Sequence, residues 1–296
     1  MDTDFNQAIK RGQLKLGLPM WYLDAWCGNL LSPWQKAGEA LSEYAQVFSS
    51  VEGNTTFYGL PDNKRAEQWR RSVGDDFRFS FKLPREISHA QNLVQAFAQH
   101  QSRWLDFSSI LGDSFGVISV QLPAELTPAR MDELFVFLEQ LKQQSSADIS
   151  VEFRHSGFFD KSGNEQRLLR QLSELHIART VFDSRGLFND LAQTEAVLDA
   201  RAKKPRMPVH PIATGHSPVV RFIGHSHWPD NERYLLQWGT KLKQWLSEGR
   251  TPYFFLHTAG NQDVQYFLRF LEQLWELDES VWPGESGAGQ SGCLFD

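Results

Sequence analysis

The sequence predicts an α/β protein with a single (β/α)8 TIM-type barrel. Short runs rich in β-branched and aromatic residues alternate with longer helical patterns along the whole chain. Successive runs begin about 30 to 40 residues apart, which is the size of one strand–helix unit. Eight such units suit a chain of 296 residues, because a barrel of this type needs about 250.

The eight expected strands are nearly continuous in apolar residues, as in the run Val117–Val120. This pattern is typical of parallel strands that are covered on both faces. The expected strands begin near Leu14, Val47, Phe77, Val117, Asp148, Ile177, Val219 and Tyr253.

Several connecting segments carry helix-start signals. Ser32-Pro33 and Thr127-Pro128 each place a capping hydroxyl before a proline, which suits the first position of a helix. Asp62 is expected to cap a helix that runs through Trp69, and Asn261 or Gln262 to open the last helix.

One domain is predicted over residues 1–296, with its core at about 14–277. Residues 283–296 are rich in Gly and Ser and are expected to form a loose C-terminal extension. The segment 202–218 is long and contains prolines and basic residues, which indicates a functional or packing loop rather than a linker.

Composition excludes several classes of protein. With 41% hydrophobic and 13% aromatic residues the chain can bury a core, so wholesale disorder is excluded. Two cysteines, Cys27 and Cys293, are too few for a disulfide framework or a structural zinc site. A net charge of -6 argues against nucleic acid as the partner.

The sequence also bears on where in the cell the protein is expected to be. Residues 1–15 contain no apolar segment of the kind found in a signal peptide. No stretch approaches the roughly 18 apolar residues that a membrane span needs. We therefore expect a cytoplasmic protein without membrane contact.

The carboxyl ends of the expected strands are rich in polar and ionisable side chains. Barrel enzymes carry out their chemistry at this end. A salt-bridge network that only caps the barrel is the structural alternative, although burying so many charges is costly unless something uses them. The candidate residues are Glu52, Asn54, Lys82, Gln121, Glu152, Arg154, Asp183, Arg221 and His257.

These residue types predict an enzyme that binds a small polar or anionic ligand at the rim. Carboxylates and imidazole can move protons, so the candidate catalytic residues are Glu52, Glu152, Asp183 and His257. Guanidinium and ammonium groups match the oxygens of phosphate and carboxylate. The candidate ligand-binding residues are Asn54, Lys82, Gln121, Arg154 and Arg221.

No cofactor and no metal are expected. The sequence contains no Walker A, G-x-S-x-G or H-E-x-x-H motif. His225 and His227 are spaced as a pair of metal ligands, but nearby Lys and Arg side chains would repel a cation.

Two other classes of function stay open. A nucleic-acid-binding or nuclease-like protein would use the basic run from Lys203 to Arg206, and its affinity would fall steeply with salt. A barrel that binds a ligand without catalysis would use the same rim. The sequence leaves the substrate and the oligomeric state undetermined.

Several blocks occur together and in a fixed order: Val51–Tyr58, Phe77–Lys82, Gln121–Pro123, Val151–His155, Phe182–Arg185, Val220–Gly224 and Phe255–Thr258. In this combination the chain resembles the YecE-like family, domain of unknown function 72, from about residue 16 to 274. The resemblance implies a single (β/α)8 barrel but no particular reaction. Ala259-Gly260-Asn261 departs from the family's usual pattern, which puts a role of that loop in doubt.

Overall fold

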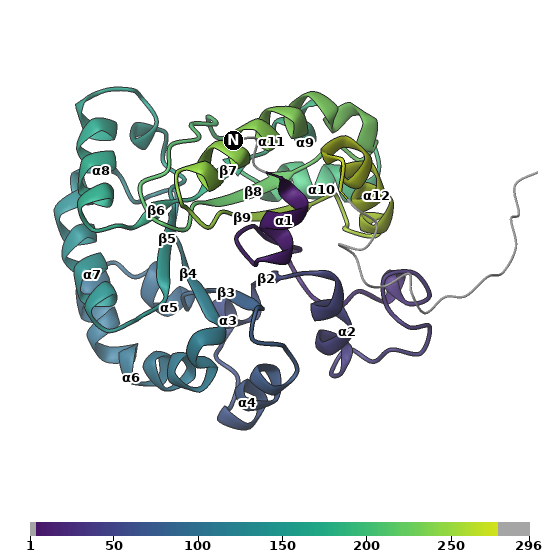
Figure 1. Cartoon of the computed structure of the whole chain (residues 1–296). Coiled ribbons are helices and arrows are strands. Elements are labelled where there is room, and N and C mark those ends of the chain that lie inside the picture. Colours follow the sequence, from purple (N-terminus) through teal and green to yellow (C-terminus); the bar gives the residue numbers. More distant parts are fainter. Residues whose placement is uncertain (1–3, 278–296) are drawn as a thin grey trace, which may run out of the picture.

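The computed structural model describes residues 4–277, in which strands and helices alternate (Figure 1). The strands lie close to the positions that the apolar runs predicted. They are β1 Lys15–Gly17, β2 Ser50–Gly53, β3 Arg78–Lys82, β4 Phe115–Gln121, β5 Asp148–Glu152, β6 Ala178–Arg179, β7 Val181–Asp183, β8 Val219–Ile223 and β9 Tyr253–His257.

All strand pairs are parallel, and they form two sheets. One sheet has the order β1-β9-β8-β7 and the other the order β2-β3-β4-β5-β6. The predicted α/β fold with parallel strands is therefore confirmed. Within residues 4–277, however, the strand pairing does not join the two sheets into one closed barrel.

The two sheets approach each other at both of their boundaries. Only Thr180 separates β6 from β7, and its N–H donates to the carbonyl of Val151 on β5 at 2.9 Å. At the other boundary the N–H of Glu52 donates to the carbonyl of Leu18, which directly follows β1, at 2.9 Å.

The helices surround the strands (Figure 1). Short 3-10 turns, labelled η, interrupt the connections. The helices are α1 Phe5–Lys10, α2 Ala40–Val47, α3 Thr55–Tyr58, α4 Asn63–Arg71, α5 Arg85–Ser88, α6 Leu93–Leu111, α7 Met131–Gln143, α8 Gly163–Glu174, α9 Arg185–Asn189, α10 Glu195–Lys203, α11 Glu232–Ser247 and α12 Val264–Trp275. The turns are η1 Asp24–Trp26, η2 Gly112–Ser114, η3 Pro128–Arg130, η4 Ser156–Phe158 and η5 Trp228–Asn231.

The helix-start signals succeed in part. Asp62 caps α4 as predicted, since its carboxylate accepts from the N–H of Arg65 at 2.8 Å. At Pro128 a 3-10 turn leads into α7. The start predicted at Ser32-Pro33 is wrong, because α2 begins only at Ala40. The N–H and hydroxyl of Ser32 bind the Glu43 carboxylate instead, both at 2.8 Å.

The core lies between the strands and the helices that cover them. Most apolar side chains of α7 and α12 are buried there. A smaller apolar cluster, formed by Val117, Val219, Tyr253 and Phe255, is separate from this core. The predicted extension 283–296 lies outside the described residues.

Candidate functional site

A buried ionic cluster is centred on Arg221 of β8. Arg221 lies two residues beyond Val219 and therefore on the same face of its strand. Its Nε is 2.5 Å from Glu52 Oε1, and its Nη2 donates to Glu52 Oε2 at 3.1 Å. Its Nη1 donates to Glu152 Oε2 at 2.5 Å. One guanidinium thus engages both predicted catalytic glutamates.

Two further groups complete the contacts of these carboxylates. His257, at the end of β9, places Nε2 3.2 Å from Glu52 Oε2. Arg154 donates from Nε to Glu152 Oε1 at 2.7 Å. Each of the four carboxylate oxygens therefore faces a guanidinium or imidazole nitrogen.

Lys82 and Gln121 extend the cluster along the neighbouring strands. Lys82 ends β3 and Gln121 ends β4, and Lys82 Nζ donates to Gln121 Oε1 at 2.8 Å. The ammonium group also lies 5.7 Å from the centre of the Phe57 ring. Both polar side chains are buried.

The arginines keep the glutamates ionised. Burial alone would raise the pKa of Glu152, but Arg221 and Arg154 outweigh it and lower the pKa to about 2. Burial would likewise raise the pKa of Glu52, but Arg221 and His257 hold it well below its usual range. The two carboxylates in turn raise the pKa of Arg221 against the effect of its burial.

The other titratable groups of the cluster are shifted towards their neutral forms. Burial, followed by repulsion from Arg221, lowers the pKa of Lys82 to about 7. Burial lowers the pKa of His257 to about 4, although Glu52 opposes that effect. At neutral pH the imidazole is therefore uncharged, and much of the Lys82 amine is as well.

Lys204 belongs to this site, although the sequence analysis did not include it among the rim residues. It directly follows α10 and is half-buried. Burial and repulsion from Arg221 lower its pKa to about 8, while Glu52 and Glu152 oppose the shift. The sequence signal was the basic run from Lys203 to Arg206, which entered the sequence analysis only through the nucleic-acid-binding alternative.

Asp183 is the exception among the predicted catalytic residues. It accepts from Arg185 Nη2 at 2.8 Å and from the Trp238 indole at 2.8 Å. Its neighbour Phe182 lies beneath the Arg221 guanidinium, 5.1 Å from ring centre to Cζ. Successive side chains of a strand point to opposite faces, so Asp183 is directed towards α11 rather than towards Arg221. The prediction that Asp183 converges with the other rim residues is therefore wrong.

Asn54 follows the end of β2 and makes contacts with the backbone. Its side-chain amide donates to the carbonyls of Pro19 at 3.0 Å and Glu52 at 3.4 Å. These bonds tie the end of β2 to the segment after β1. The structure thus places Asn54 beside the cluster as a brace for the strand that carries Glu52.

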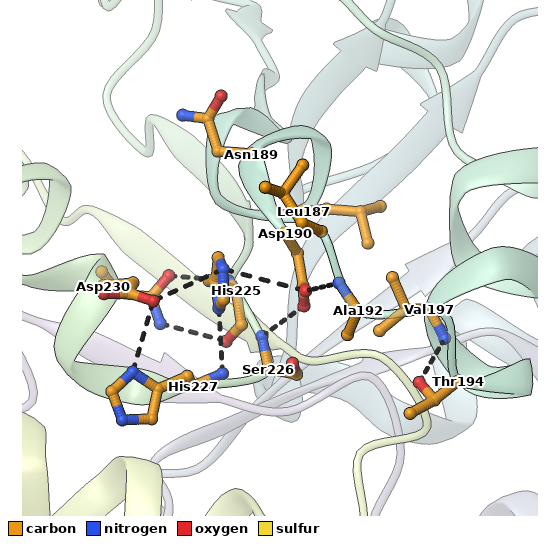
Figure 2. A network of polar contacts seen from close by, with 12 residues as sticks. Leu187, Asn189, Asp190, Ala192, Thr194, Val197, His225, Ser226, His227 and Asp230 are labelled. Carbon is orange, nitrogen blue, oxygen red and sulfur yellow. Dashed lines mark hydrogen bonds and ion pairs between the residues drawn. The ribbon is translucent and has the colours of Figure 1, made fainter.

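The pair His225 and His227 lies in a separate polar network (Figure 2). His225 Nε2 is 3.5 Å from an Asp230 oxygen and 3.7 Å from an Asp190 oxygen, and its Nδ1 accepts from the N–H of His227. A pocket of about 500 Å³ borders this network beside Asn189. Within the described chain, no group of three or more His, Cys, Asp or Glu side chains is arranged to hold a metal ion.

Comparison with known proteins identifies the family. A family model described as "Protein of unknown function DUF72" matches residues 15–288. The chain belongs to the DUF72 family. It is 37% identical over 265 residues to UPF0759 protein YecE of Escherichia coli K12, covering 88% of this chain and 91% of that protein. The YecE protein of Escherichia coli O157:H7 is 36% identical over the same length.

Two solved DUF72 structures share the fold. One, from Enterococcus faecalis V583, has a TM-score of 0.61 at 16% identity and covers 90% of this chain and 96% of its own. The other, from Thermotoga maritima MSB8, has a TM-score of 0.58 at 19% identity and covers 88% of this chain and 99% of its own. None of the described helices of this DUF72 protein is long and apolar enough to cross a membrane.

Proposed function

We propose that this DUF72 protein is an enzyme that binds a small anionic ligand at the carboxyl ends of its strands. The observation that carries the proposal is an excess of cations in the cluster. Three charged basic side chains, Arg154, Lys204 and Arg221, surround two carboxylates, Glu52 and Glu152, and Lys82 adds a partial positive charge. An anion would balance this charge.

Arg154 and Lys204 are the groups that would contact the anion. In the part of the chain that the structure describes, Arg154 donates to protein only through Nε, which leaves its two terminal amino groups for a ligand. Its side chain is 23% exposed, and Lys204 is half-buried. A phosphate or carboxylate here would gain charge-assisted hydrogen bonds and would favour the charged form of Lys204.

The glutamates serve this site by holding Arg221. Glu152, with a pKa of about 2, is a poor proton donor at neutral pH. We therefore assign Glu52 and Glu152 the task of orienting Arg221, and His257 that of a neutral proton relay. Gln121 and Lys82 would face the polar centre of the ligand.

The proposal includes a single domain built as a closed (β/α)8 barrel. Two features support it: the backbone hydrogen bonds at both boundaries of the sheets, and one apolar core that contains residues from Phe5 to Leu277. In such a barrel the carboxyl ends of all strands open on one face, where barrel enzymes bind their ligands.

The test is a binding measurement with matched lysine variants. Inorganic phosphate and small carboxylates at low ionic strength should raise the melting temperature, because they bind the native state. Lys204→Gln should weaken phosphate binding about tenfold, as loss of a charged partner implies. Lys203→Gln is the control, since Lys203 is exposed and pairs with Asp199.

Two outcomes would overturn the proposal. One is that no anion stabilises the protein at low salt. The other is that Lys203→Gln weakens binding as much as Lys204→Gln. Tight, salt-sensitive binding of DNA or RNA instead of small anions would favour the nucleic-acid alternative.

A further inference from the structure

Within residues 4–277 Lys82 forms no ion pair with a carboxylate, although Glu52 and Glu152 are near enough to act on its charge. Arg221, Arg154 and His257 occupy the four oxygens of Glu52 and Glu152. Among the described residues the amine has one hydrogen-bond partner, the neutral amide oxygen of Gln121 at 2.8 Å. A buried ammonium without a salt bridge is unusual, because its desolvation is not compensated.

The surroundings favour the neutral amine. The Lys82 side chain is only 7% exposed, and Arg221 repels a second positive charge. These two effects lower the pKa of Lys82 to about 7. A neutral lysine amine carries a lone pair and acts as a nucleophile towards carbonyl carbon.

We propose that Lys82 forms an imine with a carbonyl group of the ligand. This inference rests on the proposed function, and it narrows the substrate class to an aldehyde or ketone that also carries a phosphate or carboxylate. Arg154 and Lys204 would hold the anionic group while Lys82 meets the carbonyl carbon. Gln121 would fix the direction of the amine through its hydrogen bond.

The covalent step needs no further reagent. The lone pair of Nζ forms a bond to the carbonyl carbon, and the π electrons of the C=O bond move to oxygen. Transfer of one N–H proton to that oxygen gives a carbinolamine. The carbon–oxygen bond then breaks, and the second N–H proton leaves with the hydroxyl group as water, so the amine and carbonyl yield an imine and water.

Lys15 provides a matched control within the same chain. It is also buried, and burial followed by repulsion from Arg78 lowers its pKa to about 8. It lies in the first position of β1, whereas Lys82 ends β3. Its Nζ donates to the carbonyl of Asp76, and the anion-binding residues are at the other ends of the strands. A lysine of low pKa outside the cluster is therefore available for comparison.

The experiment uses pyridoxal 5′-phosphate as the carbonyl probe on the full chain, followed by borohydride reduction and peptide mapping. We expect Lys82 to be labelled about a hundredfold faster than exposed lysines at neutral pH, because far more of its amine is uncharged. The rate should rise with pH with a midpoint near 7. Inorganic phosphate should compete, and pyridoxal, which lacks the phosphate, should label more slowly.

Lys82→Met should lose the label while Lys15→Met keeps it. Labelling spread evenly over exposed lysines of the wild-type protein would overturn the imine proposal, and that result needs no variant to fold. If phosphate still raises the melting temperature in that case, the anion site stands and only the imine fails. If phosphate has no effect either, both proposals fail.

Discussion

Arg221 on β8 donates a 2.5 Å hydrogen bond to Glu152 on β5, although these two strands belong to different sheets. The same guanidinium contacts Glu52 on β2, which is also in the second sheet. All three side chains are buried. The ionic cluster therefore ties the two sheets together at the carboxyl ends of their strands.

Replacement of Arg221 should be strongly destabilising. Arg221→Met leaves two ionised carboxylates buried without their main partner. Breaking a buried pair in this way costs about 3–5 kcal/mol of unfolding free energy. Urea denaturation followed by circular dichroism would measure the loss.

The companion variant is the triple replacement Glu52→Gln, Glu152→Gln and Arg221→Met. It removes the charges together, so it should recover most of the stability lost in the single variant. If Arg221→Met has the same urea denaturation midpoint as the wild-type protein, the cluster contributes little to stability.

His257 should make the protein sensitive to mild acid. The pKa of His257 is about 4 in the folded protein, against its ordinary value of 6.5, which the unfolded chain has. A lowered folded pKa means that the stabilisation is fully present above pH 6.5 and is lost as the pH falls towards 4. The loss over that window is about 3 kcal/mol, at 1.4 kcal/mol per pH unit.

His257→Gln should flatten the stability profile between pH 6.5 and 4. Below that window the stability should fall further because Glu152 becomes protonated. Its pKa in the folded protein is about 2, so its stabilising effect is lost as the pH falls towards that value. The control is the exposed His216, whose replacement by Gln should leave the profile unchanged. If the pH profile of stability is unchanged in His257→Gln, then His257 does not cause the loss of stability in mild acid.

The strand positions were predictable from the sequence, since each strand is a short apolar run. The expected start at Asp148 coincides with β5, and that at Val219 with β8. The helix start predicted at Pro33 is wrong because the Ser32 hydroxyl binds a distant carboxylate instead of capping a helix. Ser32 binds Glu43 eleven residues later, and a local capping rule does not include such a contact.

Most of the cluster was also predictable, because residues near the ends of parallel strands converge. The two differences have physical reasons. Asp183 is displaced by one residue in register, which turns it to the other face of its strand and towards Trp238. Lys204 enters from a long connection whose path depends on contacts with distant segments, such as that from Ser184 Oγ to the carbonyl of Pro205 at 3.0 Å.

Gly17 on β1 should be intolerant of any side chain. A Cβ at this position would lie 2.2 Å from the carbonyl oxygen of Ser50 on β2, far inside contact distance. Gly17→Ala should therefore separate the two strands and cost more than about 3 kcal/mol. Thermal or urea denaturation would show it.

Gly38 gives the matched control for this substitution. Apart from the adjoining residues, no atom of the described chain lies within 4 Å of a Cβ built there, so Gly38→Ala should leave the stability nearly unchanged. Equal stability of the two variants would show that β1 and β2 are not held at this close approach.

The connection that carries Lys204 is held by a second buried ion pair. Arg179 Nη1 donates to Glu165 Oε1 at 2.8 Å, and His210 Nδ1 lies 2.7 Å from the same oxygen. Arg179 also donates to the carbonyl of His210 at 3.2 Å. The segment after Lys204 is thus fixed to α8, which carries Glu165, and to β6, which carries Arg179.

His210→Ala should loosen this segment and weaken anion binding without touching the ligand. Loss of a charge-assisted hydrogen bond of about 1.5 kcal/mol should speed hydrogen exchange across residues 204–214 about tenfold. Phosphate affinity should fall because Lys204 is no longer held near Arg221, and saturating phosphate should restore part of the protection. His216→Gln, two residues beyond the segment and exposed, should change neither quantity. Faster hydrogen exchange with unaltered phosphate affinity would show that the order of residues 204–214 does not affect anion binding.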